Sequence, residues 1–398
     1  MKGETQTVVI GAGPVGKFAA LSLARLGVEV EILDEGSRGA VHSYALALHP
    51  ESLRLLDELG VADELVASGQ RIERMGFHRR DERLGQLDFS ELGGPFPFVL
   101  VAPQSALEQA LEQRLNREKV RVWWKHQALA VSQDAARVAL RVGRREKYSM
   151  GYPVAGTEWM ITRESDVHSR FLIGADGYHS FVRRSHDDAF ESGGPAQVFS
   201  VYEFPLTVDA PQEARVFFHD GTTNVFWPLH DRRGRLSFQV EPGSPPSPSV
   251  EGLNDLIRER VSWLPAEIEQ VYWTSTAMFE RRLAKSLGSN RIWLAGDAAH
   301  LTGPVGAQSM NVGLREAHDL ARRIADGIAR GASADAIGSY DADWRAEWRA
   351  LLNLDGRLEA TPALAKALGA QLAELPACVP ASGADLDALL SQIGVRLR

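Results

Sequence analysis

The chain has 398 residues, of which 44% are hydrophobic and 24% are charged, and its formal net charge is −8. This length favours two domains, and the composition is that of a globular protein. The acidic balance argues against non-specific binding to nucleic acid, the single cysteine excludes an internal disulfide, and no Cys/His cluster has the spacing of a metal site.

The first predicted unit, over residues 7–34, is a strand, a glycine-rich turn, a helix and a second strand. The turn reads Gly11-Ala12-Gly13-Pro14-Val15-Gly16, Gly27 ends the helix, and Asp34 ends the second strand. Here the glycines permit a tight turn, the approach of a pyrophosphate and close packing of helix on strand, while the carboxylate accepts hydrogen bonds from a ribose diol. The unit predicts dinucleotide binding and does not distinguish NAD from FAD.

Two helical stretches are predicted next, at residues 50–68 and at 103–118, where Pro103 opens the helix. Residues 120–175 have the pattern of strands and hairpins. Within them, the stretch 137–147 holds five basic residues and one acid. We interpret it as the solvated edge of a hairpin rather than a polyanion site.

Residues 196–240 show a β pattern, in which apolar and polar residues alternate. A proline-rich loop and a helix at about 252–263 follow. A short strand at 291–295 then precedes a turn and a long helix at about 309–329. This order of elements predicts a second, β-rich region between two parts of an α/β domain.

The tail after residue 340 is rich in Ala and Leu and is predicted to be helical, with breaks at Pro362 and Pro376. Cys378 lies in this tail, far from every motif, and we expect it to have no catalytic role.

Two further motifs place an aspartate just after a short apolar strand. One is Gly174-Ala175-Asp176-Gly177-Tyr178-His179-Ser180. The other is Leu294-Ala295-Gly296-Asp297-Ala298-Ala299-His300, which continues to Asn311 through a turn of small residues. Open α/β sheets bind ligands at the carboxyl ends of their strands, and the long helix after the later motif offers free N–H groups and a positive dipole end. Both motifs therefore predict ligand contacts.

Together the three motifs resemble the single-component FAD-dependent aromatic hydroxylases, the class A flavoprotein monooxygenases typified by p-hydroxybenzoate hydroxylase, over most of residues 5–330. The resemblance implies an α/β fold: a Rossmann-like FAD-binding domain with a βαβ unit of the glutathione-reductase type, an inserted β-sheet substrate domain and C-terminal helices. The implied FAD-binding domain is discontinuous and comprises residues 1–71, 99–183 and 276–340. The implied substrate domain comprises 72–98 and 184–275, and the helical segment is 341–398.

The resemblance also implies which residues bind FAD. The glycines of the first turn would cradle the diphosphate, Asp34 would hold the adenosine ribose, Asp176 would lie by the diphosphate and Asp297 would bond the ribityl chain. The backbone at Met310 and Asn311 would contact the flavin, where a helix N-terminus stabilises negative charge. The full predicted set is Gly11, Gly13, Pro14, Gly16, Asp34, Glu35, Gln104, Asp176, Asp297, Gly306, Ser309, Met310 and Asn311.

The chain departs from the family at two places. Tyr44 stands where the family usually has an arginine that contacts FAD and helps to handle the pyridine nucleotide, so the choice between NADH and NADPH stays open. The turn before the long helix reads Gly306-Ala307-Gln308-Ser309 instead of Gly-Gly-Gln-Gly. The small residues still leave room for a flavin, and Ser309 can cap the helix.

Catalytic candidates are Pro304, expected close to the flavin ring, Trp227 as an aromatic wall, and His42 and Tyr44. His219 and His230 are further candidates for a base towards a phenol, and surface positions are the alternative for all three histidines. For His300 we favour a structural, hydrogen-bonded role.

These features predict an FAD-dependent monooxygenase that uses NAD(P)H and O2 to hydroxylate a phenolic, polyketide-like or quinone-like aromatic through a flavin C4a-hydroperoxide. The alternatives are an FAD-dependent reductase or dehydrogenase, an epoxidase or Baeyer–Villiger variant, a halogenase, and a binding module without activity. The expected partners are a small aromatic substrate and O2, with no nucleic acid, no membrane span and no metal. The expected state is a cytoplasmic monomer or homodimer.

Overall fold

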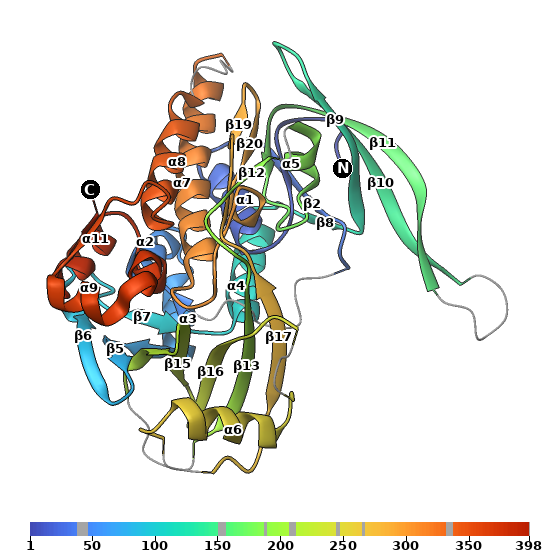
Figure 1. Ribbon diagram of the computed structural model, residues 1–398. Coiled ribbons are helices and arrows are strands. Elements are labelled where there is room, and N and C mark those ends of the chain that lie inside the picture. Colours follow the sequence, from blue (N-terminus) through green and yellow to red (C-terminus); the bar gives the residue numbers. More distant parts are fainter. Residues whose placement is uncertain are drawn as a thin grey trace.

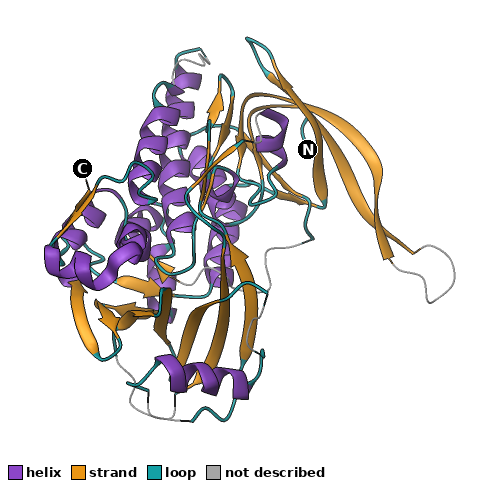
Figure 2. Ribbon diagram, viewed as in Figure 1, coloured by secondary structure: helices purple, strands orange, loops and turns teal. Residues whose placement is uncertain are grey.

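The computed structural model describes residues 1–37, 47–149, 157–186, 189–206, 212–243, 247–264, 267–331 and 337–397. Two large sheets organise it (Figure 1). The α/β prediction is confirmed, because helices and a largely parallel sheet are both present (Figure 2).

The first sheet contains the predicted βαβ unit. Strand β1 (Glu4–Ile10) pairs in parallel with β2 (Val30–Asp34) on one side and with the end of β11 (Thr157–Gly174) on the other. Helix α1 (Pro14–Arg25) connects β1 and β2; Pro14 occupies its first turn, where the missing N–H costs nothing, and Gly27 follows it at φ +78°. The sheet also includes β8 (Val122–Trp124), β9 (His126–Gln133), β10 (Val138–Ser149), β19 (Gly288–Ser289) and β20 (Ile292–Leu294).

The strands β10 and β11 form a long antiparallel hairpin that projects away from the body of the protein (Figure 1). The basic stretch 137–147 lies on β10, and the side chains of Arg141 and Arg144 are more than half exposed. The stretch thus lies on a hairpin with solvated arginines, but it is not an edge, because β10 pairs with β9 as well as with β11 over residues 138–144.

The second sheet has seven strands in the order β17-β13-β16-β15-β14-β5-β6, and only the pair β14 and β5 is parallel. Helix α6 (Val250–Arg260) covers one face of this sheet (Figure 1). Between the helix and the sheet lies a separate hydrophobic core, which includes Tyr202, Phe226 and Phe238. The strands are β5 (Arg74–Arg79), β6 (Glu82–Asp88), β13 (Gln197–Pro205), β14 (Ala214–His219), β15 (Thr222–Leu229), β16 (Arg233–Val240) and β17 (Trp273–Phe279).

The helical prediction for residues 50–68 is corrected to two helices, α2 (Pro50–Glu58) and α3 (Ala62–Ser68), because Gly60 turns the chain at φ +67°. The other helices beside the first sheet are α4 (Gln104–Arg117), α5 (Phe181–His186), α7 (Gln308–Ala329) and α8 (Tyr340–Leu351). Helix α1 packs against both α4 and α7.

The tail is helical but also contains a two-stranded sheet, which the sequence pattern did not predict. Pro362 is the first residue of α9 and Pro376 is the second residue of α10, so each proline lies at the start of a helix. The tail consists of β22 (Leu358–Ala360), α9 (Pro362–Leu368), α10 (Leu375–Cys378), α11 (Gly383–Gln392) and β23 (Val395–Leu397). Two small sheets elsewhere comprise β3 (Ala47–Leu48), β4 (Gln70–Ile72) and β7 (Val99–Val101), and β12 (Phe190–Ser192), β18 (Arg282–Ala284) and β21 (His300–Leu301).

The turn after β1 is tightly constrained by the turn after β11. Gly11 has φ +102°, and a Cβ atom there would lie 2.1 Å from the carbonyl oxygen of Ala175. We expect Gly11→Ala to lower the free energy of unfolding by about 3 kcal/mol, because strain and a backbone clash add. Urea unfolding of the apoprotein measures this, with Gly3→Ala as the control, since a Cβ at Gly3 meets nothing within 4 Å. Equal stability of the two variants would contradict this account.

Candidate functional site

A cavity of about 480 Å³ lies between the turns at the strand ends of the first sheet and the strands of the seven-stranded sheet. One side is formed by the turns that carry the three motifs, and the other by strands of the seven-stranded sheet. The structure therefore brings together motifs that lie far apart in sequence. The lining residues from the motifs include Gly13, Pro14, Ala175, Gly177, Tyr178, Asp297, Ser309 and Met310, joined by Gln104.

The glycines of the turn in the βαβ unit have two different roles: some allow close packing of the backbone, and one leaves open space at the cavity. A Cβ on Gly16 would lie 1.9 Å from the carbonyl oxygen of Gly11, so both residues serve the close crossing of strand and helix. Gly13 instead lines the cavity, and a Cβ there would meet no atom within 4 Å. The open backbone at Gly13, at the N-terminus of α1, suits the close approach of a diphosphate.

Asp34 supports this turn directly. Its carboxylate accepts hydrogen bonds from the N–H of Ala12 at 2.7 Å and the N–H of Gly36 at 2.6 Å. Glu35 points elsewhere and pairs with Arg145 at 3.2 Å. Neither Asp34 nor Glu35 is among the described residues that line the cavity.

The carboxylate of Asp176 is engaged by the chain itself. It accepts hydrogen bonds from the Ser180 hydroxyl at 2.5 Å and from the N–H groups of Phe181 and Val182 at 2.7 and 3.1 Å, so it caps helix α5. Burial raises the pKa of Asp176, and these hydrogen bonds oppose the rise. The residues on either side, Ala175 and Gly177, line the cavity instead.

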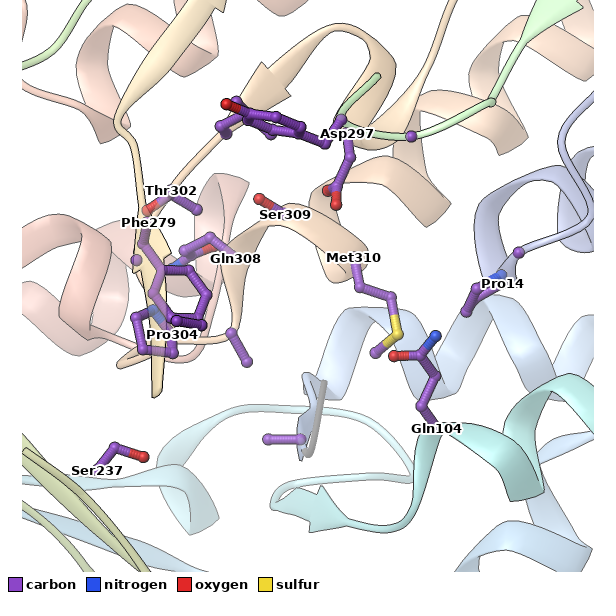
Figure 3. Close-up of a pocket in the computed structure, with 18 of the residues that line it drawn as sticks. Pro14, Gln104, Ser237, Phe279, Asp297, Thr302, Pro304, Gln308, Ser309 and Met310 are labelled. Atoms are coloured by element: carbon purple, nitrogen blue, oxygen red, sulfur yellow. The ribbon is translucent and has the colours of Figure 1, made fainter. Parts of the chain in front are cut away.

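Asp297 points into the cavity from the turn before α7 (Figure 3). Its side chain is accessible from the cavity, although protein surrounds it on the other sides. Desolvation raises the pKa of this carboxyl; His300 opposes the rise, Glu316 adds to it, and a hydrogen bond with Ser309 opposes it. A carboxylate in this position can accept hydrogen bonds from ligand hydroxyl groups.

The turn that carries Asp297 is held from behind by Glu316 of α7. The Glu316 carboxylate accepts hydrogen bonds from the N–H of Gly296 at 2.8 Å and from the indole N–H of Trp348 at 2.7 Å, and it contacts His300 Nε2 at 2.8 Å. Glu316, His300 and Trp348 are all fully buried, and the rings of His300 and Trp348 stack at 3.8 Å. His300 therefore lies inside a packed network that fixes the turn.

The N-terminus of α7 faces the cavity through Ser309 and Met310 (Figure 3). Asn311 does not line it: its side chain donates to the carbonyls of Ala47 and Ala307 and accepts from the N–H of His49, so it joins α7 to β3. Gly306 is also a packing position, because a Cβ there would lie 2.3 Å from the carbonyl oxygen of Ala377.

His49 is fully buried beneath this turn, and its Nε2 lies 2.8 Å from the carbonyl oxygen of Gly306. Burial lowers the pKa of His49 from 6.5 to about 3, with the Gly306 hydrogen bond acting in the opposite direction. The imidazole is therefore neutral at ordinary pH and acts as a hydrogen-bond donor to the turn.

Gln104 lines the cavity and is positioned by a buried ionic network. Its side-chain amide donates to Glu108 at 2.9 Å. Glu108 in turn lies 3.4 Å from the ammonium of Lys17, which is also 3.0 Å from Glu112. This network joins α1 to α4 and holds the Gln104 side chain at the cavity.

The opposite wall consists of the sheet and of the turn around Pro304. Pro304, Phe279 and Thr302 lie close together at one end of the cavity (Figure 3). Trp227, predicted as an aromatic wall, lines it from β15, and Trp273 lines it from β17. Thr302 and Gln308 line the cavity, and the Thr302 hydroxyl and the Gln308 side-chain oxygen are buried without a hydrogen-bond partner among the described residues. Such atoms suit contacts with a bound molecule.

Sequence reasoning did not select several of the residues that line the cavity. The alternation of side chains along β16 and β17 marks which residues share a face with Trp227, but the pairing of the strands is not visible in the sequence. The missed residues are Arg235, Ser237, Trp273, Ser275, Phe279, Glu280, Thr302 and Gln308.

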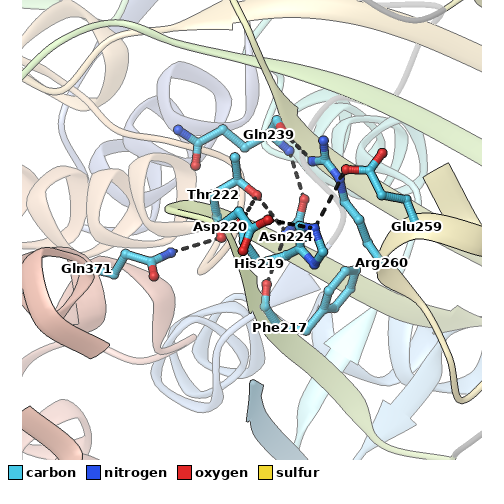
Figure 4. Close-up of polar contacts among 9 residues, drawn as sticks. All are labelled: Phe217, His219, Asp220, Thr222, Asn224, Gln239, Glu259, Arg260 and Gln371. Atoms are coloured by element: carbon cyan, nitrogen blue, oxygen red, sulfur yellow. Dashed lines mark hydrogen bonds and ion pairs between the residues drawn. The ribbon is translucent and has the colours of Figure 1, made fainter. Parts of the chain in front are cut away.

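Two of the candidate bases, His219 and His230, lie in the described part of the chain and away from the cavity lining. His219 lies in a polar cluster at the turn between β14 and β15, with Asp220 at 3.5 Å and Glu259 at 3.6 Å (Figure 4). His230 is 60% exposed and pairs with Asp231. Neither is among the described residues that line the cavity. His42 and Tyr44 lie outside the described residues.

Within the described ranges, no helix combines the length and apolar character needed to cross a membrane. In the same ranges, no three His, Cys, Asp or Glu side chains are grouped to hold a metal ion. Cys378 is buried, and burial raises the pKa of its thiol. The thiolate is therefore strongly disfavoured at this position.

A family model described as an FAD binding domain matches residues 4–354. An uncharacterized aromatic compound monooxygenase of Bacillus subtilis is 30% identical over 85% of this chain and 65% of its own length. A 6-methylpretetramide 4-monooxygenase of Streptomyces rimosus is 27% identical over 85% of this chain and 58% of its own. The chain thus spans less than two thirds of either relative.

Among solved structures, p-nitrophenol 4-monooxygenase of Pseudomonas putida has the same fold, with a TM-score of 0.74 at 20% identity. The match covers 98% of this chain and 97% of the other.

We expect Glu316→Gln to lower the free energy of unfolding by about 2–5 kcal/mol, because one amide group cannot accept from all the donors that the carboxylate serves. Urea unfolding measures the loss. Glu82→Gln, at an exposed position on β6, is the matched control and should stay within about 0.5 kcal/mol of the wild type. A Glu316→Gln variant as stable as this control would show that the network is dispensable.

His49 should make stability depend on pH. Because its folded pKa of about 3 lies below its unfolded value of 6.5, the unfolded state binds more protons between these values, and stability falls as the pH is lowered from 6.5 towards 3. We expect His49→Gln to flatten this dependence by up to about 1.4 kcal/mol per pH unit. Urea unfolding at several pH values measures the slope, with exposed His230→Gln as the control. An unchanged slope in His49→Gln would contradict the prediction.

Proposed function

The chain belongs to the FAD-binding domain family, and from this premise we propose that it is a flavoprotein monooxygenase that uses NAD(P)H and O2 to hydroxylate an aromatic small molecule. One observation carries the proposal: a single cavity is lined both by the FAD-type turns at Gly13, Asp297 and Met310 and by the aromatic side chains Trp227 and Trp273. Relatives named as monooxygenases of aromatic compounds support the same reaction class.

The residues present fit FAD. In this proposal Gly13 and the N-terminus of α1 bind the diphosphate, Asp297 accepts hydrogen bonds from the ribityl hydroxyls, and Gln104 contacts the same chain. The backbone of α7 at Ser309 and Met310 lies against the flavin, where the positive end of the helix stabilises negative charge. Asp34 acts by holding the glycine turn in shape.

Bound FAD supplies the oxygen chemistry: two electrons from NAD(P)H reduce O2, one oxygen atom enters an aromatic C–H bond, and the other leaves as water. The protein's own contribution is to place the ring and to exclude water. Pro304 is proposed to hold the aromatic ring beside the flavin, and Trp227 is proposed to line the wall of the cavity farther along the sheet. The orphan oxygens of Thr302 and Gln308 are proposed to accept hydrogen bonds from bound molecules.

The seven-stranded sheet with α6 is proposed as the substrate-binding region, and the first sheet as the FAD-binding region. Tyr44 stands in place of the family's arginine, so we propose that this position sets how the pyridine nucleotide is handled. The rates at which NADH and NADPH reduce the bound flavin show which of the two nucleotides the protein prefers.

We expect the purified wild type to carry flavin colour, and Asp297→Ala to bind FAD at least about tenfold more weakly, because charge-assisted hydrogen bonds to the cofactor are lost. Titration of the apoprotein with FAD measures this. Asp326→Ala changes an exposed aspartate on helix α7, which follows the turn that carries Asp297, and serves as the matched control.

Incorporation of labelled oxygen tests the reaction. With NAD(P)H and a panel of phenols, we expect one atom of labelled O2 in the product. Oxidation of NAD(P)H with label only in hydrogen peroxide or water, for every compound of the panel, would count against a monooxygenase and in favour of a reductase.

A further inference from the structure

The face of the seven-stranded sheet that borders the cavity is organised in rows. Because side chains alternate along a strand, residues paired in register point to the same face. Trp273, Glu203, Arg235 and Trp227 form one such row across β17, β13, β16 and β15. The next row holds Ser275, Val201 and Ser237. Except for Glu203, all of these side chains line the cavity.

The row at Arg235 contains a buried charge flanked by tryptophans. Arg235 is 6% exposed, and its Nε donates to Glu203 at 2.8 Å, with Nη2 donating to the same oxygen. Its guanidinium lies 5.4 Å from the ring centre of Trp273. Burial lowers the pKa of Arg235 and Glu203 opposes the change; an arginine nevertheless stays charged at ordinary pH.

Arg235 is the only basic residue among the described residues that line the cavity, whereas Asp297 and Glu280 line other parts of it. A buried ion pair is usually no more stabilising than well-packed apolar residues, so stability alone does not explain a charge at this wall. A guanidinium carries five N–H donors, arranged to bind planar oxygen groups such as carboxylates.

The Arg235 row lies far along the sheet from the turn around Pro304. Phe279, which lies beside Pro304 and Thr302, is six residues after Trp273 on β17 (Figure 3). At about 3.3 Å per residue, the two ends are about 20 Å apart between Cα atoms. A molecule that reaches both ends is therefore much longer than a single benzene ring.

We propose that Arg235, together with the hydroxyls of Ser237 and Ser275, binds an anionic oxygen group at the far end of an elongated, fused-ring aromatic substrate. Trp227 and Trp273 supply the aromatic surface on either side of this group. The opposite end of the substrate lies towards Pro304, where the proposed hydroxylation takes place. This inference rests on the proposed function, because that function makes the cavity a substrate-binding site.

Ligand titration tests the inference without turnover. We use anthraquinone-2-carboxylate and its neutral isostere anthraquinone-2-carboxamide, added to the FAD-loaded protein without NAD(P)H. Perturbation of the flavin spectrum and quenching of tryptophan fluorescence measure binding. We expect the wild type to bind the carboxylate at least about tenfold more tightly than the carboxamide, because a charge-assisted pair with Arg235 adds to the shared ring contacts.

In Arg235→Met we expect this preference to be lost, with binding of the carboxamide unchanged, and in Arg235→Lys we expect an intermediate preference. Because Arg235→Met leaves Glu203 buried without its cation, the double variant E203Q/R235M is made as well and should behave in the same way. Arg258→Met, on the exposed side of α6, is the matched control and should keep the wild-type preference.

Equal binding of the two probes by the wild type, a preserved preference in E203Q/R235M, or no binding of either probe would overturn the inference. Failure of the proposed function is recognised separately. A protein that binds the carboxylate through Arg235 but incorporates no labelled oxygen keeps this inference and loses the monooxygenase. A protein that incorporates labelled oxygen but binds the carboxylate independently of Arg235 is a monooxygenase, and this inference is then wrong.

Discussion

The carboxylate of Glu316 is fully buried, and three parts of the chain depend on it. It bonds the turn that carries Asp297, the ring of His300 and the indole of Trp348. A buried carboxylate is tolerated only where its oxygens are satisfied, so this one fixes the positions of β20, α7 and α8 relative to each other. The wall of the cavity at Asp297 follows from that arrangement, because the aspartate belongs to the turn that Glu316 holds.

Hydrogen bonds and close packing also join the tail of the chain to the turn before α7. The side-chain amide of Gln308 donates to the carbonyls of Val379 and Ala381, and Gly306 lies against Ala377. On the other side, Asn311 and His49 fasten the start of α7 to β3. The loop beside the proposed flavin position is thus clamped from both directions, and the clamp explains why small residues are needed in it: a Cβ at Gly306 would strike the tail.

Charge is distributed unevenly along the cavity. Acidic side chains lie on the side of the nucleotide-binding turns, where backbone N–H groups and helix N-termini supply positive potential. Arg235, the only basic residue among the described residues that line the cavity, lies on the sheet beside two tryptophans. This arrangement suits two different occupants: a cofactor rich in hydroxyl and phosphate groups on one side, and an aromatic molecule with an oxygen-bearing end on the other.

The sequence by itself determined the βαβ unit, the positions of the three turns and the long helix α7. These signals are local: Gly11, Gly16 and Asp34 lie within one supersecondary unit, and an apolar strand followed by an aspartate can be recognised over a few residues. Only the tertiary structure decided that Asp176 caps α5, that Asn311 is a cross-link, and that Arg235 shares a row with Trp227 and Trp273. Those roles depend on which segments meet, and the register between distant strands is set by packing of the whole sheet, which no short stretch of sequence specifies.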